Sequence, residues 1–196
     1  MLTLQQCADA VASYQAKPDI YQEGMRRAAV AMILHGSEES PELLMFQRAV
    51  YEGDPWSAQM AFPGGRVENS DSSLLDTAIR ECQEEFGVDL ASKAERIGEL
   101  SERQAGSWRE NPMKMVVKPF VFKASASLNF LPNREVQQIV SIPLSYFCDL
   151  TNRQIFSVSF NDREYRLPCY LYKGFRIWGL SLGFIDELLQ LTKSKA

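Results

Sequence analysis

The sequence has few of the residues that build transition-metal sites. Its 196 residues include one histidine and four cysteines, and no CxxC pair occurs. A zinc cluster is therefore not expected, because such clusters need several closely spaced Cys or His ligands. We interpret the cysteines as core thiols and assign no role to His35, which lies in an expected turn. The cysteines are Cys7, Cys82, Cys148 and Cys169.

Long apolar runs and dense basic clusters are also missing. No stretch approaches the roughly 20 apolar residues that span a bilayer, and Met1–Gln6 lack the basic start of a secretory signal. The net charge of −4 argues against broad electrostatic binding to nucleic acid. We therefore predict a cytoplasmic protein with neither a membrane nor a nucleic-acid partner. A small anionic substrate remains compatible with this charge if a divalent cation or a few arginines receive it.

The order of predicted elements indicates an α/β protein. A composition of 45% hydrophobic and 23% charged residues is typical of a globular domain. We expect residues 1–22 to form an N-terminal helical extension and residues 23–196 a single domain whose sheet is covered by helices on both faces. The expected strands are residues 27–34, 42–48, 60–62, 96–100, 115–122, 135–142, 154–160 and 164–170, and the expected helices are residues 4–14, 143–147 and about 180–191, besides the one described next.

Residues 64–88 predict a loop, a helix and a stop. Asp71, Ser72 or Ser73 can cap the start of the helix, and Gly87 suits the left-handed residue just past its end. Apolar residues at three- and four-residue spacing predict a buried stripe, and the other side chains are expected to face outward. The stripe consists of Leu74, Leu75, Ala78, Ile79, Cys82 and Phe86.

Three glutamates stand together on this helix. Glu81, Glu84 and Glu85 are related by three- and four-residue spacing, which brings their Cβ atoms to about 5–6 Å from one another. Their mutual repulsion is reversed by a hard cation, and Mg²⁺ or Mn²⁺ binds carboxylates without any His or Cys ligand. Arg80 can hold one of the carboxylates or contact a substrate oxygen, and we favour the orienting role. The alternative for a bare ExxEE pattern is a solvated acidic face.

The full string Gly65-x5-Asp71-x8-Arg80-Glu81-x2-Glu84-Glu85-x-Gly87-Val88 resembles the Nudix box, the signature of hydrolases that act on nucleoside diphosphates linked to another group. The first acidic position is Asp71 rather than Glu, and one extra residue separates it from Arg80. With the preceding residues 61–65, both departures look like the Nudix subgroup that includes coenzyme A pyrophosphatases.

The resemblance covers roughly residues 26–190. Segments 43–48, 133–136 and 142–144 match that subgroup, and residues 176–179 match where they are expected to open the last helix. Residues 53–60 depart from it, because coenzyme A hydrolases usually carry a short Ser/Leu-Arg segment there.

The resemblance implies a fold and a set of roles. The fold is the Nudix α/β/α sandwich with a mixed β-sheet between helices. Glu81, Glu84 and Glu85 would bind the divalent metal, Arg80 would orient them, and Asp71 and Gly65 would shape the loop. Bound metal would offset the charge of a pyrophosphate so that water attacks one phosphorus, with Glu84 or Glu135 as the candidate general base.

Substrate contacts are predicted around the same loop. Arg48 and Arg66 flank the expected cleft and can contact phosphates, as can the turn at Gly64 and Gly65. Trp56 and Trp108 lie in predicted loops and can stack on an adenine, whereas Trp178 is expected in the core.

Four functional hypotheses follow. The first is hydrolysis of coenzyme A or an acyl-CoA, for which the 3′-phosphate is the distinguishing group. The second is hydrolysis of ADP-ribose or another nucleotide sugar. A binding module that senses a nucleotide is the third, although the complete acidic set favours catalysis, and a purely structural acidic domain is the fourth. The last helix is interpreted as a packing element, with dimerisation through it left open.

Overall fold

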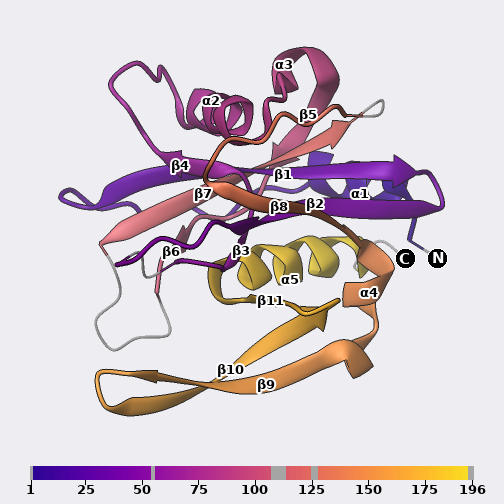
Figure 1. Cartoon of the computed structure of the whole chain (residues 1–196). Coiled ribbons are helices and arrows are strands. Elements are labelled where there is room, and N and C mark those ends of the chain that lie inside the picture. The colour runs from indigo at the N-terminus through magenta and orange to yellow at the C-terminus, as the bar shows by residue number, and fades with distance from the viewer. Residues whose placement is uncertain (1, 54–55, 107–113, 125–127, 194–196) are drawn as a thin grey trace.

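The computed structural model describes residues 2–53, 56–106, 114–124 and 128–193. The predicted order of strands and helices is largely observed, with additional short elements (Figure 1). In chain order the elements are α1 (Leu4–Ala12), β1 (Arg26–Ser37), β2 (Ser40–Arg48), β3 (Met60–Ala61), β4 (Gly64–Arg66), α2 (Leu74–Phe86), α3 (Leu90–Lys93), β5 (Ala94–Glu99), β6 (Arg103–Gln104), β7 (Met115–Ala124), β8 (Val136–Pro143), α4 (Leu144–Cys148), the 3-10 turn η1 (Leu150–Asn152), β9 (Arg153–Phe160), β10 (Arg163–Tyr172), β11 (Phe175–Trp178) and α5 (Gly179–Lys193).

The main sheet is mixed. Among the described residues its order is β3-β2-β1-β7-β5, with β4 beside β1, β6 beside β7 and β8 beside β2. β1 and β7 run parallel over nine paired positions, and the other pairs are antiparallel. This arrangement matches the predicted fold class, an α/β/α sandwich with a mixed sheet between helices.

The chain segment 60–66 enters the sheet between β1 and β2. β1 and β2 pair with each other only from Ile33 onward along β1. The earlier part of β1 pairs with β4, and the last part of β2 pairs with β3. The Ala31 amide donates to the Pro63 carbonyl at 2.8 Å and continues the pairing across the turn. The glycine turn of the box is therefore held inside the sheet, directly below α2.

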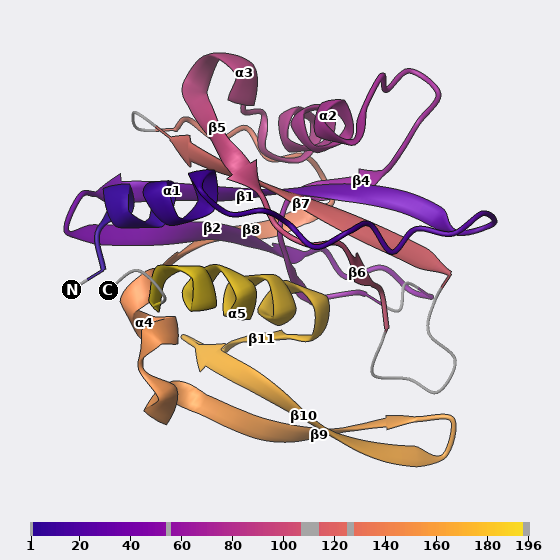
Figure 2. The same cartoon turned by 180° about the vertical axis from the view of Figure 1, so that it is seen from behind.

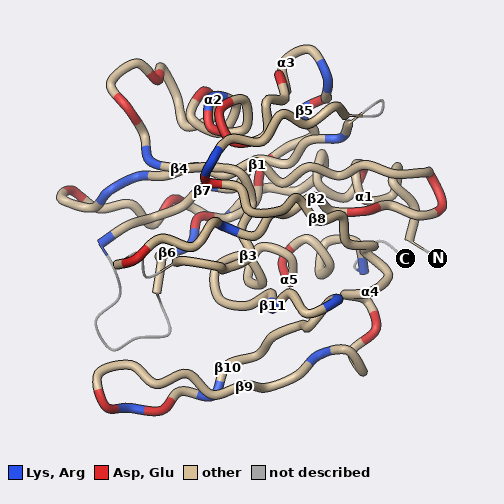
Figure 3. The backbone as a smooth tube through the Cα atoms, in the orientation of Figure 1, with Lys and Arg blue, Asp and Glu red and all other residues tan. Residues whose placement is uncertain are grey.

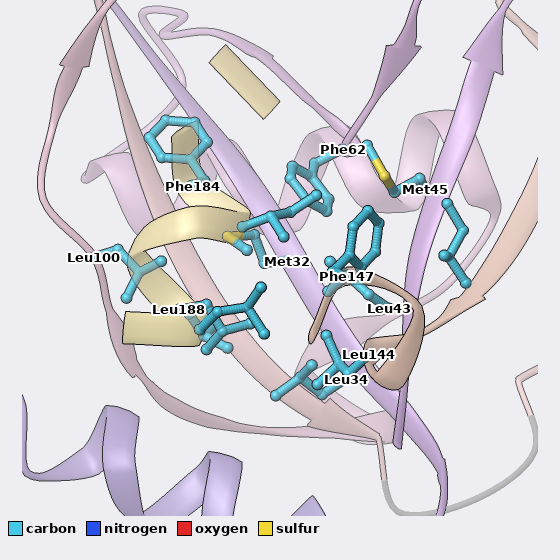
Figure 4. Packing of buried hydrophobic residues seen from close by; sticks show 14 of the residues in the cluster. Met32, Leu34, Leu43, Met45, Phe62, Leu100, Leu144, Phe147, Phe184 and Leu188 are labelled. Atoms are coloured by element: carbon cyan, nitrogen blue, oxygen red, sulfur yellow. The ribbon is translucent and has the colours of Figure 1, made fainter. Parts of the chain in front are cut away.

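Two hydrophobic cores lie on opposite faces of the main sheet (Figures 1 and 2). One packs α2 and α3 against one face, and Phe46 of β2 meets Phe86 of α2 edge to face at 5.5 Å. The other packs α1, α4 and α5 against the opposite face. Figure 4 shows this larger core, where Met32, Leu34, Leu43 and Met45 of the strands meet side chains of α4 and α5.

A second, three-stranded sheet is formed by β11, β10 and β9, in that order, and the expectation of one sheet is wrong here. Residues Arg176–Trp178 were expected to open the last helix, but they form β11, because they pair with Cys169–Leu171 of β10. Helix α5 begins only at Gly179, whose φ of +60° turns the chain from strand to helix. The small sheet lies below the main sheet with α5 between them (Figure 1).

Helix α1 packs into the larger core. Thr3 caps it, and its Oγ1 accepts from the Gln6 amide while Gln6 Oε1 accepts from the Thr3 amide. Cys7 and Val11 are buried against α5 and β5, so the N-terminal segment shares the core of the rest of the chain. In the part of the chain that the structure describes, no helix is long and apolar enough to cross a membrane.

Candidate active site

Helix α2 carries the acidic cluster (Figure 3). Ser73 caps its start, because its Oγ accepts from the Asp76 amide at 3.2 Å. Gly87 ends it with a φ of +69°, and a Cβ at Gly87 would lie 2.7 Å from Leu131 Cβ. The amides of Leu131 and Asn133 donate to the Phe86 and Glu85 carbonyls at 2.8 and 3.1 Å. The segment 131–133 thereby satisfies carbonyls that the end of the helix leaves open.

Arg80 is held by the loop that precedes the helix. Its Nε and Nη2 both donate to the Asp71 carboxylate at 2.9 Å, and Nη2 also donates to the Arg66 carbonyl at 3.1 Å. Asp71 also accepts from Thr77 Oγ1 and from the Glu68 amide. The hydrogen bonds from Arg80 hold the pKa of Asp71 well below its usual range. This paired fork fixes the loop to the helix, and it shows how Asp shapes the loop at this position.

The remaining nitrogen of Arg80 faces the glutamates. Nη1 donates to Glu81 Oε1 at 3.1 Å and to Glu84 Oε1 at 3.3 Å. Because all three nitrogens of the guanidinium have protein partners, the geometry favours the orienting role over a direct substrate contact. The Glu81 carboxylate lies close against Gly65, in the space that a Cβ at this position would occupy.

Glu85 is buried, which corrects the expectation that all three glutamates face outward. It is 3% exposed, whereas the Glu84 side chain is 53% exposed. Glu85 lies seven residues after Ala78 and three after Cys82, so it belongs to the same face of the helix as the buried stripe. Its Oε2 accepts from the Gly64 amide at 2.9 Å, which lets a carboxylate occupy this position.

Burial changes the protonation of this cluster. The pKa of Glu85 is raised to about 8, mainly by desolvation; the charges of Glu81 and Glu135 add to the rise, and the Gly64 amide and the Arg48 charge oppose it. Desolvation also raises the pKa of Glu81, with Arg80 opposing the rise and Glu84 and Glu135 adding to it. The pKa values of Glu81 and Glu85 are therefore raised both by burial and by the negative charges of neighbouring carboxylates.

The donor set fits a hard divalent cation. Glu81, Glu84 and Glu85 offer oxygen ligands only, and two of them have raised pKa values that a cation would reverse. Among the described residues, no group of three His, Cys, Asp or Glu side chains is already arranged as a metal site. Arg80 Nη1 binds both Glu81 and Glu84, and the Gly64 amide binds Glu85.

Glu135 and Arg48 are brought to the cluster from distant parts of the sequence. Arg48 is the last residue of β2 and pairs with Val136 at the start of β8. The Ala49 amide donates to the Glu135 carbonyl at 2.8 Å, and the Glu135 amide donates to Asn133 Oδ1 at 2.8 Å. Both side chains act electrostatically on Glu85.

The other predicted contacts are less closely tied to the cluster. Gly64 and Gly65 lie directly below α2, where the Gly64 amide binds Glu85. Arg66 is exposed, and only its carbonyl contacts Arg80. Trp56 is half-buried in a turn whose carbonyl accepts from the Gln59 amide, and its stacking role stays a prediction. Trp108 lies outside the described residues, and Trp178 is half-buried rather than fully in the core.

Three supporting residues were not foreseen. Thr77 is fully buried and bonds Asp71, Asn133 joins the end of α2 to Glu135, and Tyr51 Oη donates to the Arg134 carbonyl at 2.9 Å. The sequence signals were the position of Thr77 next to the buried Ala78 and that of Asn133 in the segment 133–136, which resembles the Nudix subgroup. Tyr51 bonds Arg134, which is distant along the chain, and Asn133 bonds Glu85 at the end of α2. No periodic pattern in the sequence indicates either contact.

The Tyr51 contact supports a testable positioning role. Tyr51→Phe removes one hydrogen bond to the peptide that precedes Glu135, and we expect kcat to fall about fivefold with KM little changed, as for a bond worth about 1 kcal/mol. Kinetics of Tyr51→Phe, Glu135→Gln and the double variant test this prediction. In the Glu135→Gln background Tyr51→Phe should have no further effect.

Tyr146→Phe is the matched control, because Tyr146 Oη also donates to a backbone carbonyl, that of Leu171, on the α4 face of the sheet. Its kcat should equal that of the wild type. Additive losses for Tyr51→Phe and Glu135→Gln would contradict the positioning role.

The raised pKa of Glu85 predicts a pH-dependent stability. A carboxyl whose pKa is higher in the folded state stabilises the fold at low pH, and this contribution is lost as pH rises from about 4.5 through about 8. In chelator, Glu85→Gln should therefore melt increasingly above the wild type between pH 5.5 and 8.5. Each pKa unit is worth about 1.4 kcal/mol, so we expect a difference of several degrees at pH 8.5.

Thermal melts across this pH range measure the effect, and saturating Mg²⁺ should remove the advantage of the variant because only the wild type gains from the cation. A melting difference that is constant with pH would show that Glu85 is ionised in the folded protein at neutral pH.

The comparisons with known proteins agree with this architecture. Residues 25–154 match the NUDIX domain family. A Nudix hydrolase named NudL from Photorhabdus laumondii is 29% identical over 174 residues, covering 88% of each chain. NudL from Yersinia pestis is 31% identical over 166 residues, covering 84% of this chain and 79% of that protein. The chain therefore belongs to the Nudix hydrolase family.

A solved structure shows the same fold. The NUDIX domain of Shewanella oneidensis NrtR, in complex with ADP ribose, superposes with a TM-score of 0.57 at 16% identity and covers 93% of this chain and 96% of that chain. This match shows the fold alone. The family match and the Nudix hydrolase relatives make the chain a pyrophosphohydrolase that acts on nucleoside diphosphate derivatives, in a family that generally uses divalent metal ions.

Proposed function

We propose that the chain hydrolyses the pyrophosphate bond of coenzyme A or an acyl-CoA. The observation that carries this proposal is the fork between Asp71 and Arg80, at 2.9 Å for both nitrogens. Asp71 and the extra residue before Arg80 are the features in which the box resembles coenzyme A pyrophosphatases. The two hydrogen bonds from Arg80 to Asp71 support the view that a Nudix box with this altered spacing is functional.

The proposed cofactor is Mg²⁺ or Mn²⁺, held by Glu81, Glu84 and Glu85. When bound, such a cation offsets pyrophosphate charge and lowers the pKa of a water molecule. The chain itself arranges the ligands: Arg80 holds Glu81 and Glu84, and the Gly64 amide holds Glu85. The positive charge of Arg48 beside Glu85 suits a phosphate oxygen of the substrate.

Glu135 fits the role of general base better than Glu84. Glu84 accepts a hydrogen bond from Arg80 at 3.3 Å, so its carboxylate is already engaged by a neighbouring side chain. Glu135 is exposed, and its charge acts on both Glu81 and Glu85, so it lies at the rim of the cluster. We propose that Glu135 accepts the proton of the attacking water.

A matched substrate panel tests the proposed function. Purified protein with Mg²⁺ or Mn²⁺ is incubated with coenzyme A, dephospho-coenzyme A, ADP-ribose and UDP-glucose, and products are resolved by chromatography. We expect the highest kcat/KM on coenzyme A and a clear loss on dephospho-coenzyme A, which lacks only the 3′-phosphate. The Glu84→Gln protein, prepared in the same way, controls for a contaminating hydrolase.

Each other result has a defined meaning. Preference for ADP-ribose or UDP-glucose would overturn the substrate while keeping the metal site, and equal rates with and without the 3′-phosphate would exclude a dedicated coenzyme A pocket. The absence of cleavage for all four compounds would contradict hydrolysis of these classes.

A further inference from the structure

A cavity of about 360 Å³ lies between the main sheet and the small sheet. One wall is Gln47 of β2 with residues 57–60, and the other is formed by β9, β10 and β11. The second wall lies almost entirely beyond residues 25–154, the part that matches the Nudix family. This cavity is therefore built by joining the family domain to its C-terminal extension.

The cavity is separated from the acidic cluster by the main sheet. Phe46 of β2 packs against Phe86 of α2, and side chains alternate along a strand, so Gln47 points to the opposite face. Met60, which pairs with Gln47 and also lines the cavity, belongs to the core on the α5 side. A molecule in this cavity thus occupies a different face of the sheet from Glu81, Glu84 and Glu85.

Among the described residues that line the cavity there is one charge, and it is positive. Arg176 is the only Asp, Glu, Lys, Arg or His in that part of the lining. Its guanidinium carbon lies 4.7 Å from the centre of the Phe156 ring. Among the described residues, this guanidinium has neither an ion-pair partner nor a hydrogen bond. A guanidinium that stacks by its face keeps the N–H groups of its edge available to an anion.

Aromatic rings form the neighbouring wall. Phe156 and Trp178 meet edge to face at 5.1 Å, and Phe175 also lines the cavity. Such rings offer flat contact area to a planar ligand. The Gln47 amide, whose Nε2 donates to the Ala58 carbonyl at 3.3 Å, places a polar group on the facing wall.

The facing wall also contains a strained residue. Ala58 has a φ of +59°, a conformation that residues with a side chain rarely adopt. Ser57 beside it bonds both the amide and the carbonyl of Tyr51, at 2.8 and 2.6 Å, and holds this turn in place. Strained backbone of this kind often occurs where a protein clamps a ligand.

We propose that this cavity is a second binding site, which takes a planar aromatic molecule that carries an anionic group. The ring packs against Trp178, and the anion binds Arg176. A volume of about 360 Å³ lies near the lower end of the roughly 300–1,000 Å³ range of small-molecule sites, which suits a ligand of mononucleotide size. Binding here requires none of the carboxylates of α2.

Binding of AMP to the full chain in EDTA tests the proposal, with adenosine and 1-naphthoate as the other probes. Calorimetry should show that AMP binds at least tenfold more tightly than adenosine. Arg176→Gln should reduce AMP affinity to that of adenosine and leave adenosine binding unchanged. Arg166→Gln is the matched control, because Arg166 is exposed on β10 and points away from Phe156; it should bind AMP like the wild type.

Two further measurements locate the site. AMP should quench the fluorescence of the wild type but not that of Trp178→Phe, and Glu84→Gln should bind AMP like the wild type even though it is expected to be inactive. If 1-naphthoate and AMP both bind, and Arg176→Gln lowers the affinity for both equally, the site takes aromatic anions in general. If AMP binds and 1-naphthoate does not, the site takes nucleotides. AMP affinity lost in Glu84→Gln but kept in Arg176→Gln, or no binding of either anion at millimolar concentration, would overturn the proposal.

Discussion

Replacing Glu85 by Gln is expected to lower kcat by a hundredfold or more while the protein stays folded. Glu85 is the most buried of the three glutamates, and its Oε2 already has a fixed donor in the Gly64 amide. Gln keeps an oxygen for that donor but removes the negative charge that a cation needs. A loss of about 3 kcal/mol in transition-state stabilisation corresponds to the hundredfold effect.

Glu84→Gln should cause a loss of the same order for a different reason. Its side chain is 53% exposed and bonded to Arg80, so the substitution leaves the core untouched and changes only the charge beside Glu81. Steady-state rates over a range of Mg²⁺ concentrations show whether added metal recovers part of the activity, as expected if metal affinity is what was lost.

Asp76→Asn is the matched control for both variants. Asp76 is an exposed acidic residue in the first turn of the same helix, so its substitution changes the charge of α2 by the same amount. Its rate should stay within about twofold of the wild type, because a surface substitution of this kind costs only a few tenths of a kcal/mol. If Glu85→Gln or Glu84→Gln retained a near wild-type rate, the assignment of the metal ligands would be wrong.

Gly65→Ala is expected to lower activity and Gly64→Ala to lower stability, although the two residues are neighbours. The three atoms nearest to a Cβ at Gly65 all belong to the Glu81 carboxylate, the flexible end of a side chain that can move away. The protein should therefore fold with nearly unchanged stability and lose activity about a hundredfold, because Glu81 is displaced from the cluster. Melting curves and Mg²⁺-dependent rates measure the two effects separately.

A Cβ at Gly64 meets backbone instead. It would overlap the Ala29 carbonyl oxygen and lie 2.6 Å from Val30 Cα, inside the sheet, at a φ of +155°. Strands β1 and β4 would have to separate, so we expect a loss of several kcal/mol in the free energy of unfolding and poor recovery of folded protein. A stable and active Gly64→Ala protein would contradict the close insertion of the glycine turn between β1 and β2.

The sequence predicts the local features of the site well. Ser73 and Gly87 mark the ends of α2 because capping depends on neighbouring residues only, and the spacing of the glutamates follows from the helical period. The resemblance to the Nudix box implied that Asp71 shapes the loop, and the structure adds that Asp71 does so by accepting from Arg80 at 2.9 Å. These features involve residues within about two turns of one another.

The burial of Glu85 was predictable but was missed. Its position relative to Ala78 and Cys82 places it on the buried face, but only apolar residues were assigned to the predicted stripe, so Glu85 was expected to face outward. What makes the burial tolerable is the Gly64 amide, 21 residues away, and the nearby Arg48 charge. No local pattern contains these two partners.

The sequence by itself determined the α/β class, the caps of α2, the acidic trio and membership of the Nudix family. Those features depend on the chemistry of short segments and on their periods. The tertiary structure decided the protonation of Glu85, the approach of Arg48 and Glu135, and the cavity beside Arg176. Each of these features requires strands that are distant in the sequence to pair. Strand pairing depends on how whole faces of the sheet pack, and a short segment of sequence does not specify that packing.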